Sequence, residues 1–496
     1  MPGNAEYKLI CALTLCTLLS GCTVGPQYQR PETPKPSRFT ETPLVEKTVS
    51  SQGPGGNAQT FYLNSQVPAK WWELFHSPSL TKLINEAFIN NPTIGAAKAA
   101  LKVAQENYRA QAGTYLYPQL DLALGAQREQ MAGAGFGNEN ASPSIFNLFN
   151  SQVNVSYNVD LFGKNRSDLA GLCAQIDYQR YQLEAAYLTL AANIVTTAIT
   201  EASLLKQIKV AKDIIALEEK VLDISKKQFF YGGTSRTVVL TQETQLAQSK
   251  TVLPPLEKNL AQTRHSLAAL IGSVPSQSDI PAINLDEITL PEEVPVSLPS
   301  QLVEQRPDIR AAEALVKQAN AQIGVATANL LPQITLSGFY GWQANQLDLL
   351  YNPNTLIWNF ASAVTQPIFH GGALLAQRRQ AIAAFEQAKY QYQQTVLLAF
   401  QNVADSLRAI EFDAKALNAQ TEAVNSAKEL YDISTKQYEL GAINYLALLI
   451  VQRSYNTAVL SQVQAQEKRY TDTAALFQAL GGGWWHSPLQ GEKPHG

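Results

Sequence analysis

Two long stretches of the chain, residues 164–253 and 368–487, contain no proline. In the second stretch every seventh residue before Gly441 is apolar or aromatic, namely Val396, Val403, Ile410, Leu417, Val424, Tyr431 and Tyr438. The positions 209 residues earlier keep this character, with Glu201 the one polar member of Tyr187, Ile194, Glu201, Ile208, Ile215, Leu222 and Phe229. A heptad seam this long predicts coiled-coil helices of about 65 residues, each rising roughly 100 Å, that pack along one another.

Each seam runs into a glycine-containing break, after which the helical pattern resumes. The breaks lie in KQFFYGGTSRTVVLT (227–241) and KQYELGAINYLALLI (436–450). Glycine readily adopts positive φ, which a helix needs where the chain reverses. The tips of two helical hairpins are therefore predicted at Gly232, Gly233, Gly441 and Ala442.

The two halves of the chain also share short motifs. Asn-Pro-Thr-Ile at 91–94 corresponds to Arg-Pro-Asp-Ile at 306–309, and Tyr-Pro-Gln-Leu at 117–120 corresponds to Leu-Pro-Gln-Ile at 331–334. The period is far longer than the roughly 20–50 residues of a solenoid repeat, so the pattern indicates an internal duplication. We expect each copy to contain a helix, two strands, a very long helix, a glycine turn and a helix, in that order.

Changes in composition mark the predicted boundaries. The N-terminal region is rich in Pro, Ser, Thr and Gly, and a second Pro-rich segment lies between the two copies. The predicted organisation is a lipoprotein signal peptide at 1–21, an extended N-terminal tether at 22–75, a first repeat at 76–272, a Pro-rich linker or equatorial region at 273–300, a second repeat at 301–481 and a C-terminal tail at 482–496.

The N-terminus has the pattern of an export signal. Leu9 to Leu19 form a mostly apolar run that is too short to span a bilayer and ends in Leu-Ser-Gly-Cys at 19–22. Small residues before a cysteine are typical of a bacterial lipobox, so Cys22 is the predicted lipidation site. The alternative is an ordinary signal peptide with an incidental cysteine. Thr23, rather than an acid, favours the outer membrane, and no apolar run long enough for a helical span follows residue 22.

Residues 152–161, QVNVSYNVDL, alternate apolar and polar side chains over their whole length. This period of two, over about ten residues, suits a transmembrane β-strand with one lipid-facing side, although a half-buried strand of a soluble sheet gives the same pattern. Further strand candidates are 119–127, 333–342 and 356–369. Trp342, Trp358 and Phe360 are candidates for an aromatic girdle.

Four membrane strands cannot close a barrel, because single-chain barrels begin at eight strands, and an open sheet edge is not tolerated in lipid. Two chains would give an eight-stranded barrel filled by side chains, whereas three would give twelve strands and a lumen. If the barrel is formed, a homotrimer is therefore expected, with hairpins from three chains walling a tube.

Charge and motifs exclude several functions. The chain has 38 basic and 41 acidic residues, so it lacks the basic excess of a nucleic-acid-binding protein. None of its five histidines has another His, a Cys or an acid at metal-ligand spacing, and no phosphate loop or nucleophile elbow is present, which argues against an enzyme. Cys173, the one cysteine in the body of the chain, is interpreted as a small apolar filler.

Four stretches carry a family resemblance: CTVGPQYQRP at 22–31, WWELF at 71–75, LPSQL at 298–302 and RPDIRAAE at 306–313. With them the sequence resembles the TolC-like outer membrane factors, and more narrowly the NodT-type efflux lipoproteins of tripartite RND-type pumps, over essentially the whole mature chain. The resemblance implies a homotrimeric channel-tunnel, in which a shared 12-stranded β-barrel crosses the outer membrane and an α-helical barrel crosses the periplasm.

The resemblance also implies partners. A periplasmic adaptor, or membrane fusion protein, would meet the hairpin tips and connect them to an inner membrane RND-type transporter. The protein would contact outer membrane lipid, carry a covalent lipid such as palmitate on Cys22, use no other cofactor and bind no nucleic acid. It would passively conduct drugs, metals or other small toxic molecules, as in multidrug resistance.

Many relatives in this family have a leucine five residues after the second tip glycine and an aspartate nine residues after it. Here these positions are Leu446 and Ile450, so the leucine is kept and the acid is missing. We expect the periplasmic entrance to be an apolar ring of Leu446 and Ile450 that closes by dewetting. The alternative is that Ile450 packs between helices.

Two other functions stay open. One is the exit duct of a type I protein secretion system, which the same family includes. The other is a structural periplasmic coiled-coil lipoprotein without a pore, from which the strand segments would distinguish a channel.

Overall fold

A computed structural model describes residues 23–34, 36–131, 143–278 and 280–486. The predicted signal peptide and Cys22 lie outside these residues. Within them the chain is mostly helical with a smaller β component, which confirms the predicted mixed class. The chain divides into unit 1 (Met1–Glu32, Ala100–Gln179 and Ala312–Tyr392) and unit 2 (Thr33–Ala99, Arg180–Ala311 and Gln393–Gly496). Both units draw residues from both predicted copies, so the domain boundaries stay predictions.

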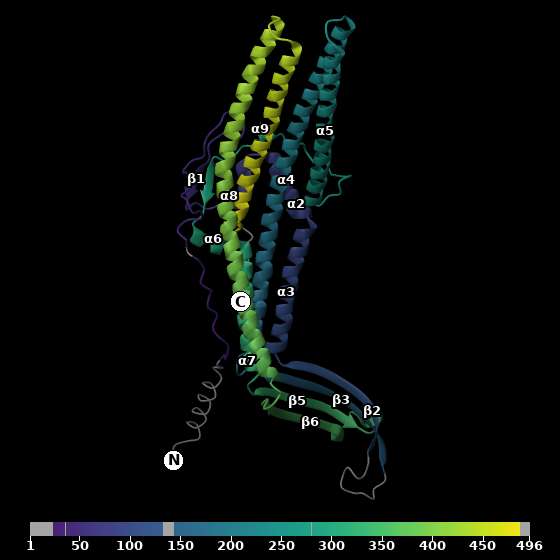
Figure 1. Ribbon diagram of the computed structural model, residues 1–496. Coiled ribbons are helices and arrows are strands. Elements are labelled where there is room, and N and C mark those ends of the chain that lie inside the picture. The colour runs from purple at the N-terminus through teal and green to yellow at the C-terminus, as the bar shows by residue number, and fades with distance from the viewer. Residues whose placement is uncertain (1–22, 35, 132–142, 279, 487–496) are drawn as a thin grey trace. The chain divides into compact units, whose positions relative to one another are not determined.

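Unit 1 contains a four-stranded antiparallel sheet in the order β2-β3-β5-β6 (Figure 1). Its strands are β2 (Gln119–Met131), β3 (Ser144–Val159), β5 (Gln333–Ala344) and β6 (Leu356–Thr365). All four strand candidates are confirmed, but β3 begins before the predicted 152, and β6 ends four residues before the predicted 369. Two short helices, η4 (Leu347–Leu349) and η5 (Pro353–Thr355), lie between β5 and β6.

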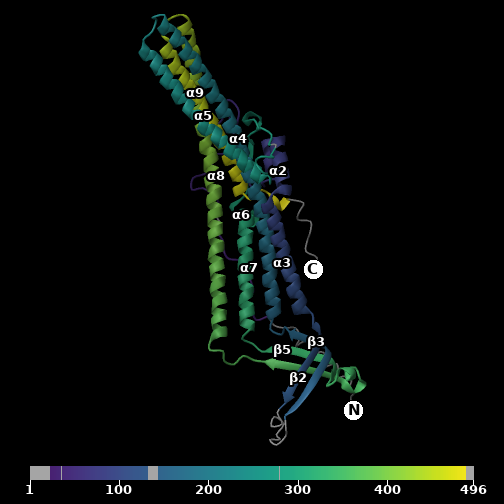
Figure 2. The same ribbon diagram turned by 90° about the vertical axis from the view of Figure 1, so that its right-hand side faces the viewer.

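Four helices of unit 1 follow one another in a row, as Figure 2 shows: α3 (Pro92–Leu116), the start of α4 (Lys164–Phe230), α7 (Pro307–Ala328) and the start of α8 (Ala373–Glu439). Side-chain hydrogen bonds join each neighbouring pair. Asp168 of α4 accepts from Tyr115 of α3 at 2.8 Å and from Gln322 of α7 at 3.5 Å, and Arg378 of α8 donates to Thr327 of α7 at 3.3 Å.

Unit 2 contains two helical hairpins (Figure 1), in which α4 turns into α5 (Arg236–Leu270) and α8 turns into α9 (Tyr445–Ala479). Both long helices have 67 residues and both returning helices have 35. Every helix boundary in one hairpin lies 209 positions from its counterpart in the other. Pro254 and Pro255, which limited the predicted proline-free stretch, lie inside α5, which continues past them to Leu270.

The predicted seam is confirmed in the middle of the long helices and is wrong near the first tip. Ile194, Val403 and Ile410 are fully buried. Towards the tips the buried positions shift to small polar residues, Ser225 and Ser434, while the predicted seam residue Phe229 is 41% exposed. A straight helix drifts away from a strict seven-residue repeat, which accounts for this shift.

The rest of unit 2 is a small mixed core. Its elements are β1 (Thr60–Leu63), η1 (Trp71–Phe75), α2 (Pro78–Asn90), η3 (Leu285–Glu287), β4 (Glu293–Val296), α6 (Pro299–Gln305) and η6 (Trp484–His486). Strand β1 pairs in parallel with β4, so the predicted tether contributes a strand that its composition did not indicate. Trp71, Phe75 and Phe477 pack together without exposure to solvent.

Two further observations concern α4. One 18-residue window in this helix has a mean hydropathy of 1.4 and is 61% buried, which is equally typical of a core helix and is weak evidence for a membrane span. Cys173, interpreted as an apolar filler, is exposed on α4, so that interpretation is wrong for the single chain.

Candidate functional site

The sheet of unit 1 has one apolar face that is exposed in the single chain. The strand register places Leu122, Val153, Tyr340 and Trp358 in one row across the four strands, and Leu120, Val155, Gly338 and Phe360 in the next. The outermost of these side chains are strongly exposed, with Leu120 at 69% and Phe360 at 72%. An exposed apolar face of this extent requires lipid or another protein surface to cover it.

The opposite face of the sheet is mainly polar. Asp121, Asn154 and Asn359 share a row with Phe339, and Asn158 of β3 accepts a hydrogen bond from Thr335 of β5 at 2.9 Å. Alternating rows of apolar and polar side chains are typical of a membrane β-barrel that surrounds a water-filled lumen. Among the described residues β2 pairs only with β3, and β6 only with β5, so both outer strands offer unpaired backbone groups.

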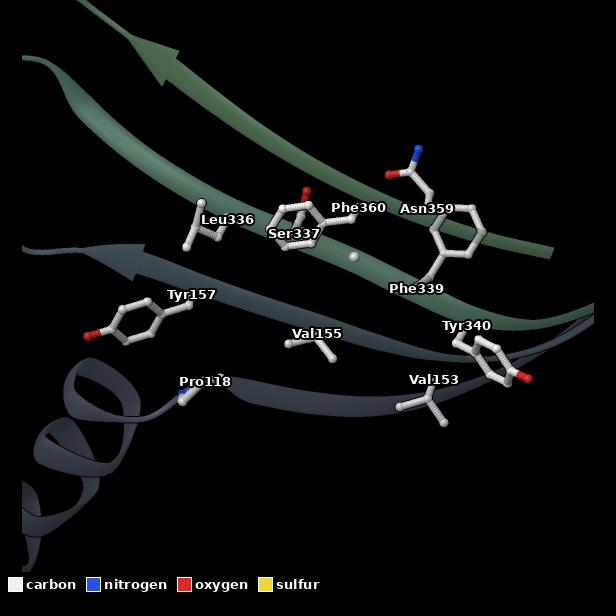
Figure 3. A pocket seen from close by; sticks show the side chains of 11 residues that line it. Pro118, Val153, Val155, Tyr157, Leu336, Ser337, Phe339, Tyr340, Asn359 and Phe360 are labelled. Atoms are coloured by element: carbon white, nitrogen blue, oxygen red, sulfur yellow. The ribbon is translucent and has the colours of Figure 1, made fainter. Parts of the chain in front are cut away.

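A shallow groove lies on the apolar face of the sheet, and Gly338 is one of its lining residues. Figure 3 shows the side chains that surround it. Its volume is about 420 Å³, and its side-chain walls include Val155, Tyr157, Leu336 and Phe360. The groove exists because Gly338 places no side chain between Val155 and Phe360. Its apolar walls fit a hydrocarbon chain.

The two hairpin tips are built alike. Gly232 and Gly441 have φ of 76° and 73°, as predicted, whereas Gly233 does not have positive φ. At the first tip the Gly233 amide donates to the Gln228 carbonyl at 2.7 Å. At the second, the Ala442 amide donates to the Gln437 carbonyl at 2.8 Å. These are Schellman turns, in which the glycine satisfies the last carbonyls of the helix while the chain reverses.

Large apolar side chains are exposed next to both tips. Phe230 is 82% exposed and Tyr231 is 83% exposed at the first tip, and Leu440 is 84% exposed at the second. The sequence prediction named the glycines and missed these three residues. The signal was present in the sequence as Phe-Phe-Tyr immediately before Gly-Gly, where no further helical turn exists to cover the rings.

Leu446 and Ile450 lie on α9 beside a groove of about 340 Å³. Leu217 of α4 and Thr241 of α5 line the same groove. Ile450 is 64% exposed and Leu446 is 39% exposed, so neither is packed away between helices of the single chain.

A hydrogen-bonded chain links three helices beside these two residues. Arg453 of α9 donates to Gln245 of α5 at 2.9 Å, and Gln245 donates to Glu218 of α4 at 3.2 Å. The other oxygen of Glu218 is buried and has no hydrogen-bond partner among the described residues. Sequence reasoning gave no indication of this link, because its members are not related by helical spacing.

Tyrosine side chains join the two helices of the second hairpin, α8 and α9. Tyr431 of α8 stacks on Tyr455 of α9, with ring centroids 5.9 Å apart, and Tyr438 approaches Tyr445 at 5.1 Å. Gln452 of α9 also donates to the Tyr431 hydroxyl at 3.3 Å. This packing places the helix that carries Leu446 and Ile450 against α8.

Two acids meet between α8 and α9. Burial, a hydrogen bond to Asp472 and the charge of Asp472 raise the pKa of Asp413 to about 7, against the opposing charges of Lys468 and Arg469. The folded chain therefore holds a proton here that the unfolded chain releases near the ordinary aspartate pKa of 3.8. By linkage, this group lowers stability progressively as pH rises from about 4 to about 7.

We expect Asp413→Asn to remove this pH dependence. The variant should be more stable than the wild type at pH 8 and should lose less stability between pH 5 and pH 8, because asparagine keeps a hydrogen bond without a charge. Thermal unfolding of the purified protein at both pH values measures the effect. Asp405→Asn, at an exposed acid of the same helix, is the control. Equal pH slopes for the wild type and Asp413→Asn would contradict the assignment.

No group of three or more His, Cys, Asp or Glu residues able to hold a metal ion occurs in the part of the chain that the structure describes. The candidate sites are exposed surfaces and grooves. They are the two-faced sheet with unpaired edges, the exposed tips and the grooved wall beside Leu446 and Ile450.

Comparison with known proteins identifies related chains. The family model described as "Outer membrane efflux protein" matches residues 83–273 and 298–482. The chain is 29% identical over 419 residues to the pyoverdine export outer membrane protein OpmQ of Pseudomonas aeruginosa, covering 84% of this chain and 87% of OpmQ. It is 27% identical over 491 residues to the probable outer membrane lipoprotein SilC of Salmonella typhimurium, covering 97% and 99%.

Among solved structures, the chain is similar to the open state of the MtrE outer membrane channel of Neisseria gonorrhoeae. The TM-score is 0.79 at 28% identity, and the match covers 93% of this chain and 99% of MtrE.

Proposed function

The chain belongs to the outer membrane efflux protein family, and from this premise we propose that it is the outer membrane exit duct of a tripartite efflux system. It passively conducts small toxic molecules, such as drugs or metals, from the periplasm to the outside. The observation that carries this proposal is the four-stranded sheet with one exposed apolar face, one polar face and two unpaired edges. The energy for transport comes from a partner in the inner membrane.

The sheet supports a shared barrel in a homotrimer. Four strands from each of three chains pair edge to edge, β6 of one chain with β2 of the next, and close twelve strands. The apolar rows then face lipid and the polar rows line a water-filled bore. This arrangement predicts heat-sensitive oligomers in outer membrane fractions. A pore-less periplasmic spacer would instead be extracted without detergent once its lipid is removed.

The helices support a periplasmic tube built from an internal duplication. The constant offset of 209 residues between the two hairpins is what a duplicated unit would produce. Two hairpins per chain give three chains twelve helices for the wall of a helical barrel. Its entrance is formed by Leu446 and Ile450 of the second copy, whereas the equivalent positions in the first copy are Thr237 and Thr241.

We propose that Cys22, which directly precedes the first described residue, carries the lipid anchor. The Val24 amide donates to the Phe162 carbonyl at 3.3 Å, and a side chain on Gly163 would collide with Thr23. These contacts hold the first described residues at the junction of β3 and α4. A palmitoyl chain on Cys22 would therefore enter the membrane beside the barrel. The name of SilC, an outer membrane lipoprotein, agrees with this.

Deletion of the gene tests the proposed function. A deletion strain should become several-fold more susceptible to small toxic compounds, should recover with the wild-type gene, and should secrete the same proteins as its parent. Loss of a secreted protein with unchanged susceptibility would instead indicate the exit duct of a type I secretion system. The adaptor and the RND-type transporter that co-purify with the protein would identify the pump.

The exposed tip residues are proposed to meet the periplasmic adaptor together with Gly232, Gly233, Gly441 and Ala442. A few residues supply most of the binding energy of a protein interface, and large aromatic residues such as Tyr are enriched among them. We therefore expect a Phe230→Ala and Tyr231→Ala double variant to bind the co-purifying adaptor about 10- to 100-fold more weakly. Phe412→Ala, at an exposed ring of α8 well before the tip, should bind normally. Equal adaptor affinity of the double variant and the wild type, measured by surface plasmon resonance, would show that the adaptor binds elsewhere.

A further inference from the structure

A cavity in unit 2 lies apart from the proposed conduit residues, and its walls are mostly aromatic. It has a volume of about 260 Å³, and Trp71 and Trp72 of η1, Phe88 of α2, Glu184 and Tyr187 of α4, and Trp484 of η6 contribute to its lining. We propose that this cavity binds a small organic cation of the quaternary ammonium class. The proposal does not depend on the transport function.

The aromatic walls are already in place without a ligand. The rings of Trp72 and Phe88 meet edge to face at 5.6 Å, and those of Phe88 and Tyr187 do so at 4.9 Å. Trp71 is fully buried and Trp72 is 6% exposed, so their rings cannot rearrange freely. Preformed aromatic walls attract organic cations through the negative charge of the ring faces.

One acid stands among these rings. Glu184 is half-buried and lines the cavity, and Arg180 is the charged neighbour that acts on its carboxylate. Burial raises the pKa of Glu184 to about 7, although the charge of Arg180, one turn earlier on α4, acts in the opposite direction. A carboxylate in such surroundings is stabilised by a cation that enters beside it.

One residue of the cavity wall also carries a buried hydrogen-bond donor. The indole nitrogen of Trp72 is buried and has no hydrogen-bond partner among the described residues. This nitrogen is closed to solvent, so a ligand in the cavity does not reach it. Choline is a small quaternary ammonium compound whose head group suits the aromatic rings and the acid.

Other ligand classes fit less well. A metal ion requires several oxygen or nitrogen ligands, and the cavity lining has one carboxylate. A neutral apolar molecule would gain nothing from the charge that Glu184 carries in its ionised form. The cavity is smaller than a drug-sized pocket of about 300–1,000 Å³, so the cation must be small. The Lys98 ammonium lies 5.8 Å from the centroid of the Tyr187 ring and would compete with a bound cation for that ring.

Binding of choline to the purified full-length protein in a neutral detergent tests the proposal, with tryptophan fluorescence as the readout. We expect a saturable change that is about 10-fold weaker in affinity for Glu184→Gln, which preserves shape and removes charge. Glu73→Gln, at an exposed acid on η1 that does not line the cavity, is the matched control and should bind as the wild type does. The neutral isostere 3,3-dimethylbutan-1-ol should bind about 10-fold more weakly than choline.

Several results would overturn the proposal. They are the absence of a saturable signal, equal affinity for the neutral isostere, or undiminished binding by a Glu184→Gln variant whose thermal unfolding matches the wild type. A chain that ends at His486 provides a further test, because the tail beyond it contains Lys493. If choline binds only to this shortened chain, the natural occupant is the tail and not a free cation.

Discussion

Replacing Arg469 with alanine is expected to lower the free energy of unfolding by about 3–5 kcal/mol, because it leaves several buried acceptors without a donor. Arg469 of α9 is fully buried. Its guanidinium donates to the carbonyls of Gly55 at 2.8 Å and Asn57 at 2.7 Å, and to the Thr48 hydroxyl at 3.2 Å. Burial lowers the pKa of Arg469 to about 10, so the group stays charged at neutral pH.

The expected consequence is release of the N-terminal segment from α9. Limited proteolysis should cut the Arg469→Ala variant between residues 44 and 60, and thermal unfolding should begin at a lower temperature. Lys468→Ala, at the exposed neighbouring position, should change stability by no more than about 0.5 kcal/mol. Equal stability of the two variants would show that the guanidinium contacts contribute little.

The long helices were predictable because local spacing determines them. The seam and the two tip glycines place α4, α5, α8 and α9 in order along the chain, and the positive φ of Gly232 and Gly441 follows from the same pattern. The end of α5 was less predictable. Proline ordinarily disfavours a helix interior, so Pro254 suggested a helix end. The helix α5 nevertheless continues past it, and the Arg264 side chain further along α5 donates a hydrogen bond to Glu201 of α4.

Glu201 shows where periodicity stops being informative. It is the one polar residue of the first seam, and it is fully buried, with its carboxylate accepting from Arg264 Nε at 2.8 Å. At the positions 209 residues later, the second copy has Ile410 and Thr473 instead. Ile410 is fully buried without a charge, so this core position does not require an ion pair. The sequence marks the exception but does not identify its partner, which lies on another helix.

The small core of unit 2 was the least predictable part of the fold. Gln59 meets Thr473 through a hydrogen bond, across more than 400 residues of sequence. Strand β1 pairs with β4. Its four residues, Thr-Phe-Tyr-Leu, favour a strand but form too short a run to predict one by themselves. Composition predicted an extended tether at 22–75, yet Phe61, Val67 and Trp71 of that range are buried. Contacts this distant in sequence are set by packing and not by local pattern. The aromatic cavity with Glu184 arises from the same distant contacts.

Replacing Ile450 with aspartate is expected to convert the periplasmic entrance from an apolar to an acidic ring. Ile450 and Leu446 are exposed beside the groove of α4, α5 and α9, and in the proposed trimer three copies of each would surround the axis. An apolar constriction excludes water and stops ion flow, whereas carboxylates hydrate it and bind cations. In planar bilayers, Ile450→Asp channels should conduct several-fold more than the wild type and should be blocked by a trivalent cation.

Ile450→Ala separates the two parts of this effect, because alanine widens the constriction without adding charge. Its conductance should rise, and it should stay insensitive to the trivalent cation. Thr241 occupies the equivalent position in the first copy and lines the same groove, so Thr241→Asp is the matched control and should conduct as the wild type does. Unchanged conductance and cation sensitivity in both Ile450 variants would place Ile450 outside the constriction. An equal response to Thr241→Asp would mean that both copies, and not the second alone, form the entrance.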